Sequence, residues 1–334
     1  MTVAVTIAIK AYNEADNIAA AIESALAAIA ELGGGEVVLA DCASTDGTAQ
    51  IASRYPIRVL SLARPDERSC GAGAQLAYQG VRTEFFYLMD GDMTLVPGFL
   101  PQALAWLQAH PDFAGVGGNV KDRYLENAEF LIREASLARD AHRREGPVDR
   151  LDGGGLYRAA AIEHLGYFAD PALRSFEEFE LAARLGVAGW KMARIDVDAV
   201  LHSGHRIDGL SLMWYRFTSG QMGGAGTLLR AALGKPHWRY TLAHLRQVRA
   251  VAAVTGWWML LLAGAIAGAW LAVASLVVIP AAFLGFRRRS LKLGLYSFLV
   301  WNLAAIATLR SFVEHPRRSS LQGKQLAFTV LHDG

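Results

Sequence analysis

Runs of apolar residues alternate with amphipathic stretches over the first 120 residues of the chain. Residues 2–9 form an apolar run rich in β-branched side chains, which is typical of a buried strand. Residues 13–32 then carry apolar side chains at helical spacing. The same pattern predicts strands at 36–40, 57–60 and 85–89 and helices at 48–55 and 70–81. This β-α-β-α-β order predicts an α/β fold, with a Rossmann-like, mostly parallel sheet and helices on both faces.

The pattern changes after residue 120. Residues 121–206 are mixed and more polar, whereas residues 207–249 are basic and aromatic. A run without charge extends over residues 250–286, and its 37 residues would make one helix of about 55 Å, against a hydrocarbon core of about 30 Å. The chain is therefore expected to be attached to a membrane. The residues expected at the interface are Trp214, Arg216, Trp238 and Arg239.

Two arrangements of the uncharged run remain open: a tight hairpin of two spans, with Gly264 and Gly268 at the turn, or one long tilted helix. Three arginines at 287–289 follow, and a hairpin would return them to the side of the basic connector, as the positive-inside rule prefers. A third apolar segment, 291–309, is open as a span, a re-entrant segment or an interfacial one. The expected organisation is a catalytic domain at 1–206, a connector at 207–249, a transmembrane region at 250–312 and a tail at 313–334.

Composition excludes some classes of function. The net charge is +2, and there is no broad basic field with interleaved aromatic residues of the kind that marks a nucleic-acid binder. The two cysteines, Cys42 and Cys70, cannot make a disulfide framework, which favours a reduced, cytosol-facing domain. Hydrophobic residues make up 53% of the chain, and their excess lies after residue 250, in agreement with a membrane anchor.

Asp90-Gly91-Asp92 directly follows the strand predicted at 85–89. Its two carboxylates therefore emerge at the C-terminal end of a buried strand, where ligands bind in open α/β sheets. Carboxylate oxygens suit Mg²⁺ or Mn²⁺, which usually share their ligand shell with substrate phosphates. The alternative is a solvated Asp-Gly turn, and the triplet alone does not distinguish the two.

Other candidate binding residues also follow predicted strands. Asp41 can accept hydrogen bonds from a base or a ribose, and Ser44 to Asp46 offer a helix N-cap with free amides. A simple capping loop explains Ser44 and Asp46 equally well. Arg68 precedes a helix start at Gly71 and can bind a diphosphate, or it is a solvated side chain on a flexible loop.

An acidic pair, Glu177-Glu178, opens a short amphipathic run. One of these carboxylates can act as a general base that deprotonates an acceptor hydroxyl. The alternative is structural, because acidic residues favour a helix N-terminus. His202 and His205 are candidates for contact with a metal or a diphosphate.

Together these motifs resemble the inverting family 2 glycosyltransferases of GT-A fold, over about residues 3–205. The chain departs from the family pattern at Lys10, Ala11, Cys42 and Gln79, and these departures bear on the identity of the donor. The resemblance rests on five motifs in the family's order: Ala11-Tyr12-Asn13-Glu14, Asp41 to Thr48 (D-x-x-S-x-D-G-T), Gly71 to Gly80, Asp90-Gly91-Asp92, and Glu177-Glu178 followed by Glu180-Leu181 and Arg184-Leu185.

The resemblance implies roles for the matched residues. Glu178 takes the position of the family's catalytic aspartate, and Glu177 remains a rival for the base. Asp90 and Asp92 would bracket the metal-diphosphate, with Mg²⁺ or Mn²⁺ as the metal and Asp92 as its direct ligand; apart from the resemblance, His202 is a further candidate ligand, or a structural histidine. The nucleotide sugar would be bound by Ala11, Tyr12, Glu14, Asp41, Ser44, Arg68, Gly71, Asp90 and the acceptor-side loop residue Gly154.

The resemblance and the membrane segment lead to one functional hypothesis. The chain is expected to be an inverting, metal-dependent hexosyltransferase at the cytoplasmic face of a bacterial inner membrane, with a nucleotide-diphosphate sugar, in first place a UDP-sugar, as donor. A lipid-linked saccharide in exopolysaccharide or other surface-glycan assembly is the expected acceptor. The alternatives are a polyprenyl-phosphate hexose synthase and a membrane-anchored nucleotide-sugar-binding scaffold without catalysis. A processive synthase is disfavoured because the chain has no Arg-Trp pair.

Overall fold

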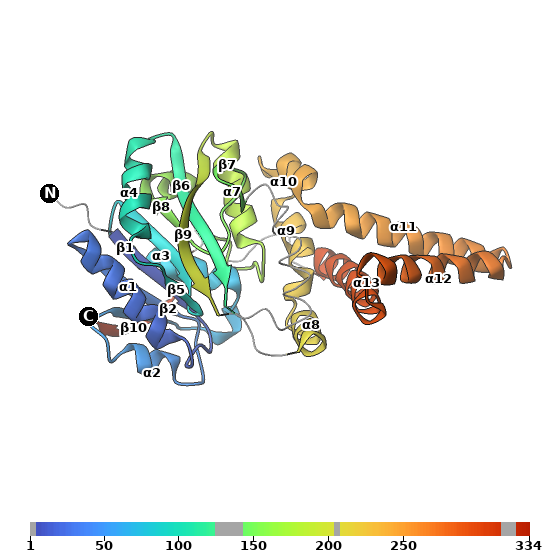
Figure 1. The fold of residues 1–334 in the computed structure, drawn as a ribbon, viewed down its shortest axis with the longest axis horizontal. Coiled ribbons are helices and arrows are strands. Elements are labelled where there is room, and N and C mark those ends of the chain that lie inside the picture. Colours follow the sequence, from blue (N-terminus) through green and yellow to red (C-terminus); the bar gives the residue numbers. More distant parts are fainter. Residues whose placement is uncertain (1–4, 124–142, 204–207, 315–324) are drawn as a thin grey trace. The chain divides into compact units, whose positions relative to one another are not determined.

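The computed structural model of the chain describes residues 5–123, 143–203, 208–314 and 325–334. The chain divides into two compact units. The first comprises residues 1–126, 130–206 and 319–334, and the second comprises 127–129 and 207–318. In the described residues, the first unit is a sheet with helices and the second consists of helices (Figure 1).

The first half of the sheet is parallel, as the sequence predicts. Its strands lie in the order β3-β2-β1-β4, and each neighbouring pair is parallel. Helix α1 begins later than predicted, because the chain turns at Asn13, where φ is 56°, before the helix starts. The elements are β1 (Val5–Ala11), α1 (Ile18–Leu32), β2 (Gly35–Asp41), α2 (Thr48–Ala52), β3 (Arg58–Leu62), α3 (Cys70–Gln79) and β4 (Phe85–Asp90).

The second half of the sheet contains both parallel and antiparallel pairs. The predicted parallel arrangement therefore holds only for the first half. The strand order continues β4-β8-β6-β9-β5, and β7 pairs with β9. Strand β8 is antiparallel to both β4 and β6, whereas β6 and β9 are parallel. The elements are β5 (Met93–Leu95), α4 (Phe99–Ala109), β6 (Phe113–Asp122), β7 (Gly146–Val148), β8 (Gly155–Arg158), α6 (Ala159–Leu165), α7 (Glu177–Val187) and β9 (Lys191–His202).

Helices cover both faces of the sheet because alternate residues of a strand point to opposite sides. In β1, Ile7 and Ile9 lie in one buried apolar cluster and Ala8 lies in another. The first cluster includes buried residues of α1, α2 and α4, and the second includes buried residues of α3, α6 and α7. This arrangement confirms the α/β fold with helices on both faces.

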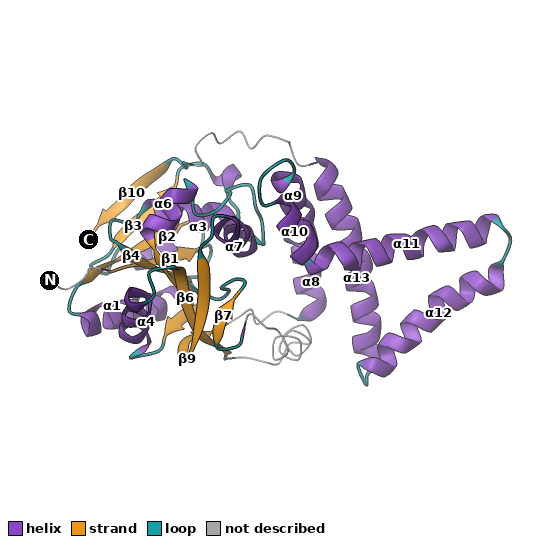
Figure 2. Ribbon diagram, turned by 90° about the horizontal axis from the view of Figure 1, so that it is seen from above, coloured by secondary structure: helices purple, strands orange, loops and turns teal. Residues whose placement is uncertain are grey.

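The C-terminal residues 313–334 are not simply the tail predicted from the sequence. Strand β10 (Phe328–Asp333) pairs antiparallel with β3, with Phe328 opposite Leu62 (Figure 2). Beside it, the side-chain amide of Gln79 donates to the backbone oxygen of Leu326 at 3.0 Å and accepts from its backbone nitrogen at 2.8 Å. Without β10, β3 would be an edge strand with unpaired backbone groups, and aromatic and β-branched residues favour such pairing.

The second unit carries the apolar segments. Among the described residues, three helices are long and apolar enough to cross a membrane: α11, α12 and α13. The turn between α11 and α12 is at Gly268, where φ is +69°, so the uncharged run forms two helices rather than one long helix, while their crossing of a membrane stays a prediction. Gly264 lies inside α11 rather than at the turn. The helices are α8 (Gly209–Thr218), α9 (Gly224–Ala232), α10 (Trp238–His244), α11 (Arg246–Ile266), α12 (Trp270–Arg287) and α13 (Leu291–Glu314).

Gly71 is packed closely at the start of α3. A Cβ added there would lie 2.1 Å from the backbone oxygen of Asp170, which cannot move away as a flexible side chain would. We expect Gly71→Ala to lower the free energy of unfolding by about 1–3 kcal/mol, the usual cost of overpacking. Denaturant unfolding followed by circular dichroism measures this change.

Gly186→Ala in α7 is the matched control, because nothing lies within 4 Å of its added Cβ. Alanine is the better helix former, so this variant is expected to be as stable as the wild type or more stable. If Gly71→Ala behaved in the same way, the close packing at α3 would be contradicted.

Candidate active site

The parallel register brings three of the predicted site residues to one edge of the sheet. Ala11 at the end of β1 pairs with Asp41 at the end of β2, and Lys10 pairs with Asp90 at the end of β4. A Cβ added at Gly91 would lie 3.0 Å from Ala11 Cβ and 3.1 Å from Glu14 Cγ. The loop after β1 and the Asp-Gly-Asp loop after β4 are therefore in direct contact.

The loop after β2 is tied to the loop after β1. Ser44 Oγ accepts a hydrogen bond from the backbone nitrogen of Asn13 at 2.9 Å. The Asp41 carboxylate is buried and accepts from the backbone nitrogen of Ser44 at 3.2 Å and from Ser61 Oγ at 3.0 Å. The N-cap position of α2 is Gly47, but Asp46 Oδ1 accepts from the Thr48 nitrogen at 3.0 Å, as a capping loop requires. These contacts hold both loops in place.

Arg68 is an exposed side chain that nevertheless has a partner in the loop after β1. Its guanidinium lies 4.0 Å from the centroid of the Tyr12 ring, a cation–π contact between two predicted binding residues. Gly71 packs against the protein itself, because its backbone nitrogen donates to the Leu173 oxygen at 2.8 Å. The absence of a side chain at Gly71 thus lets another part of the protein backbone, and not only a ligand, approach closely.

Lys10 joins the motif at the end of β4 to the start of α7. Its ammonium lies 3.1 Å from Asp90 Oδ1 and 2.9 Å from Glu177 Oε1. Burial alone would lower the pKa of Lys10, but Asp90 and Glu177 raise it well above its usual value, so the side chain is charged. Burial raises the pKa of Asp90, against the lowering effect of Lys10. Sequence reasoning treated Lys10 only as a departure from the family; a lysine that ends an otherwise apolar strand was its one signal.

Glu178 and Glu177 are in different environments. Glu177 is 6% exposed and hydrogen-bonded to Lys10, whereas Glu178 is partly exposed. Burial and the neighbouring charge of Glu177 raise the pKa of Glu178 to about 8, although Lys10 acts in the opposite direction. Burial and repulsion from Asp92 and Asp90 likewise raise the pKa of Glu14 to about 7. Two carboxyl groups of this site therefore titrate near neutral pH.

His202 lies between two carboxylates. Pairing of β5 with β9 sets Met93 opposite His202, so the ring reaches Asp92, with Nε2 3.1 Å from Oδ2. Its other nitrogen, Nδ1, lies 2.6 Å from Asp122 Oδ1. Burial alone would lower the pKa of His202, but the hydrogen bonds to Asp122 and Asp92 raise it to about 9. Sequence reasoning missed Asp122, and His205 lies outside the described residues.

The described residues contain no group of three or more His, Cys, Asp or Glu side chains arranged to hold a metal ion. Asp90 is paired with Lys10, and Asp92 with His202. A cation at this edge of the sheet would accordingly need oxygen ligands from a substrate in addition to those of the protein, as is usual for Mg²⁺.

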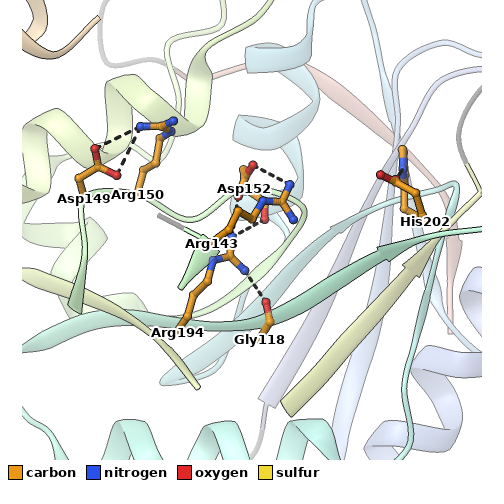
Figure 3. A network of polar contacts seen from close by, with 8 residues as sticks. Gly118, Arg143, Asp149, Arg150, Asp152, Arg194 and His202 are labelled. Carbon is orange, nitrogen blue, oxygen red and sulfur yellow. Dashed lines mark hydrogen bonds and ion pairs between the residues drawn. The ribbon is translucent and has the colours of Figure 1, made fainter. Parts of the chain in front are cut away.

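The glycine loop before β8 is held by a buried arginine (Figure 3). Asp152 lies between Arg143, at 2.8 Å, and Arg194, at 2.6 Å, and Arg194 also donates to the backbone oxygen of Gly118. A Cβ added at Gly154, whose φ is +94°, would lie 2.7 Å from Tyr87 Oη and 3.0 Å from the Leu88 oxygen. Gly154 therefore lies directly against β4, two residues before Asp90.

Comparison with known families gives one match. Residues 6–166 match the model described as Glycosyl transferase family 2. No curated protein matches the chain.

Two solved structures illustrate the similarity of fold. The mannosyltransferase PcManGT from Pyrobaculum calidifontis, in complex with GDP-Man and Mn²⁺, is 21% identical over 92% of this chain and 88% of that chain, with a TM-score of 0.64. TarS 1–349 of S. aureus in complex with UDP-GlcNAc is 13% identical over 98% and 96% of the two chains, with a TM-score of 0.52. At these identities the likeness establishes the fold, which is GT-A-like.

The two carboxylates around His202 make its contribution to stability depend on pH. Its pKa in the folded chain is about 9, above the ordinary value of 6.5, so the folded state binds the proton more tightly than the unfolded state. The stabilisation is therefore full below about pH 6.5 and is lost as the pH rises through about 9. We expect the difference in free energy of unfolding between wild type and His202→Gln to fall by up to about 3 kcal/mol across this window.

Denaturant unfolding in the presence of a chelator measures this difference at several pH values. His244→Gln is the control, because the His244 ring lies 2.9 Å from the backbone oxygen of Tyr240 and forms no ion pair with a carboxylate among the described residues. A difference for His202→Gln that stayed constant over the window would contradict the ion pairs with Asp92 and Asp122.

Proposed function

We propose that the chain transfers a sugar from a nucleotide-diphosphate sugar to a hydroxyl of a lipid-linked acceptor, with inversion at the anomeric carbon; the match of residues 6–166 to the glycosyl transferase family 2 model supports this proposal. One observation carries this proposal. Lys10 contacts Asp90 at the end of β4 and Glu177 at the start of α7. Lys10 therefore lies between Asp90, on the side proposed for the nucleotide diphosphate, and Glu177, which is next to the proposed base Glu178. A single displacement needs the leaving group and the base close to the same anomeric carbon.

The nucleotide side of the site is formed by the loops after β1, β2 and β3. Asp41 and Glu14 offer carboxylates to the base and ribose, and Arg68, stacked on Tyr12, offers a guanidinium to the diphosphate. The GDP-Man and UDP-GlcNAc in the similar structures support a nucleotide sugar as the donor class. We propose a UDP-sugar as the first donor to test and a GDP-sugar as the second.

The side chains at the carboxyl ends of these strands suit a divalent cation that also binds oxygens of the substrate. Asp90 and Asp92 supply carboxylate oxygens, and His202 Nε2, 3.1 Å from Asp92, would become a further ligand only after a cation displaced its proton. Mn²⁺ and Mg²⁺ accept such ligands together with diphosphate oxygens. When bound, the cation would offset the charge that develops on the departing nucleotide diphosphate. The Mn²⁺ in the similar mannosyltransferase structure supports this choice of ion.

Glu178 is the proposed general base. The ammonium of Lys10 is bonded to Glu177, which leaves the partly exposed Glu178 as the carboxylate that can meet an acceptor. Its pKa of about 8 suits a group that takes up a proton near neutral pH. Glu178 would remove the proton of the acceptor hydroxyl as that oxygen attacks the anomeric carbon from the face opposite the leaving group.

We place the enzyme at the cytoplasmic face of a bacterial inner membrane, in exopolysaccharide or other surface-glycan assembly. Three apolar helices support membrane attachment, which brings a lipid-linked acceptor within reach. A polyprenyl-phosphate hexose synthase is the second candidate, since a phosphate acceptor needs no strong base. A non-catalytic scaffold is disfavoured, because a binding protein has no use for a carboxyl group tuned like that of Glu178.

Substitution of the two glutamates distinguishes the base. We expect Glu178→Gln to lower kcat about 10²–10⁴-fold without loss of donor affinity, because the step it removes is proton transfer. Glu177→Gln is the matched control and is expected to lower kcat less. The measurement is nucleotide release from a panel of UDP-, GDP- and dTDP-sugars by detergent-purified protein with Mn²⁺ and a membrane lipid extract.

Two results would contradict this assignment. Full activity of Glu178→Gln with an inactive Glu177→Gln would make Glu177 the base. Lipid-dependent release that both variants retain would favour the phosphate-acceptor reaction, and donor binding without any release would favour the scaffold.

Lys10 sets the pH at which Glu178 works. The pKa of about 8 predicts that kcat/KM falls on the acid side of about pH 8, and Lys10 lowers this pKa. We therefore expect Lys10→Met to move the acid limb to higher pH, and Lys10→Arg to leave it nearer the wild-type position. Lys191→Met is the control, since Lys191 pairs with the exposed Asp112 at 2.7 Å. An acid limb that stays in place in Lys10→Met would show that Glu178 is not the titrating base.

A further inference from the structure

The pairing of β10 with β3 limits how often the chain can cross a membrane. Strand β9 ends at His202, before the apolar helices, and β10 begins at Phe328, after them, yet both belong to the same sheet. One sheet lies on one side of a membrane, so the chain between them crosses an even number of times. Residues 315–324 add no crossing, because they include three basic residues and no apolar run. Three candidate helices therefore cannot all be spans.

We infer that α11 and α12 cross the membrane as a hairpin, and that α13 lies along the lipid interface on the side of the catalytic sheet. This inference rests on the membrane attachment in the proposed function, but on no part of the proposed chemistry. Its partner is the boundary between lipid headgroups and acyl chains.

Charge identifies the two spans. The turn between α11 and α12 is Ala267-Gly268-Ala269, which carries no charge and can be moved across a membrane. The turn between α12 and α13 carries Arg287, Arg288 and Arg289 and belongs on the cytoplasmic side. Any other pair of spans would place these three arginines on the far side. The crossing pair is therefore α11 and α12.

The packing of α13 gives a second, independent argument. Helices α8, α9 and α10 have only 10, 9 and 7 residues, too short to cross a bilayer. Near its start, α13 contacts α8, since Tyr296 Oη donates to the Gly209 oxygen at 3.2 Å. Near its end it contacts α9, where a Cβ added at Gly226 would lie 2.0 Å from the Thr308 oxygen. Both ends of α13 thus lie against segments too short to cross, which favours a position of α13 on the same side as those segments; Figure 2 shows α13 beside α8 and α9.

The exposed surface of α13 fits an interface. Except for Trp301, its exposed large apolar residues recur at helical spacing, and α13 also carries polar residues at its ends, such as the ion pair of Arg310 with Glu314 at 2.9 Å. A helix with one apolar stripe and charged residues beside it lies in the plane of a membrane surface. The stripe consists of Leu291, Leu295, Leu299, Ile306, Leu309 and Val313, which are 40–76% exposed.

Labelling of introduced cysteines tests the crossings in the full chain. Single variants Ala269→Cys, Ser290→Cys and Thr329→Cys would be treated with a membrane-impermeant maleimide in sealed vesicles of either orientation. We expect Ala269→Cys to react only from the outer face, and Ser290→Cys and Thr329→Cys only from the cytoplasmic face. The unsubstituted chain is the background control, because its native Cys42 is buried and its Cys70 is partly buried in the sheet unit.

Two labelling results would overturn the inference. Reaction of Ser290→Cys and Thr329→Cys from opposite faces would make α13 a span, and reaction of Ala269→Cys and Thr329→Cys from the same face would show that the hairpin does not cross. The labelling readout uses no sugar. An inactive chain with the expected labelling would therefore refute only the proposed sugar transfer. An active chain with a different labelling pattern would refute only the proposed topology.

The depth of α13 is measured with fluorophores on Leu295→Cys and Leu309→Cys, which are both exposed. Fourteen residues of helix separate the two positions by about 21 Å along its axis. Quenchers attached at known depths along the lipid acyl chains should report equal, shallow depths for a helix in the interface. Depths that differ by most of that distance would contradict the inference.

Discussion

The ion pairs of Lys10 are the interaction on which the active site depends. A buried ammonium is costly unless it is paired, and here Asp90 and Glu177 both pair with it. The same charge holds together two segments that are far apart in sequence, the end of β4 and the start of α7. It also separates the two neighbouring glutamates chemically: Glu177 is bonded to the ammonium, while Glu178 keeps a pKa of about 8. Two adjacent, identical side chains are thus in different environments, one bonded to the lysine and one with a pKa raised mainly by burial.

The sheet register places the other groups around this pair. Parallel pairing sets the ends of β1, β2 and β4 side by side, so the loops that follow these strands meet. The mixed half of the sheet brings β9 to β5, which is why His202 meets Asp92 and Asp122. Arg194, nearly fully buried, fixes the glycine loop through Asp152. Nucleotide-side and acceptor-side groups are thus positioned by strands rather than by free loops, which favours a constant geometry.

Strand β10 couples the membrane region to the catalytic sheet. The chain leaves the sheet after β9 and returns to pair with β3, at the opposite side of the strand order. Both ends of the apolar segment are consequently held by one folded unit. That constraint, rather than hydropathy, limits the number of crossings, because α13 is long and apolar enough to be taken for a span.

Local signals were sufficient for the parallel half of the fold: strand composition, helical spacing and the Asp-Gly-Asp loop at the end of β4. The hairpin turn at Gly268 was also within their reach, as was the family resemblance. They did not reveal that Lys10 joins Asp90 to Glu177, that Asp122 accepts from His202, or that Phe328–Asp333 forms a strand. Each of these depends on a partner dozens to hundreds of residues away.

The sequence by itself thus determined which segments form strands and helices and which loops bear carboxylates, because those depend on neighbouring residues. Only the tertiary structure decided which charges meet and that the C-terminal strand joins the sheet, because strand pairing brings together residues that no local pattern connects.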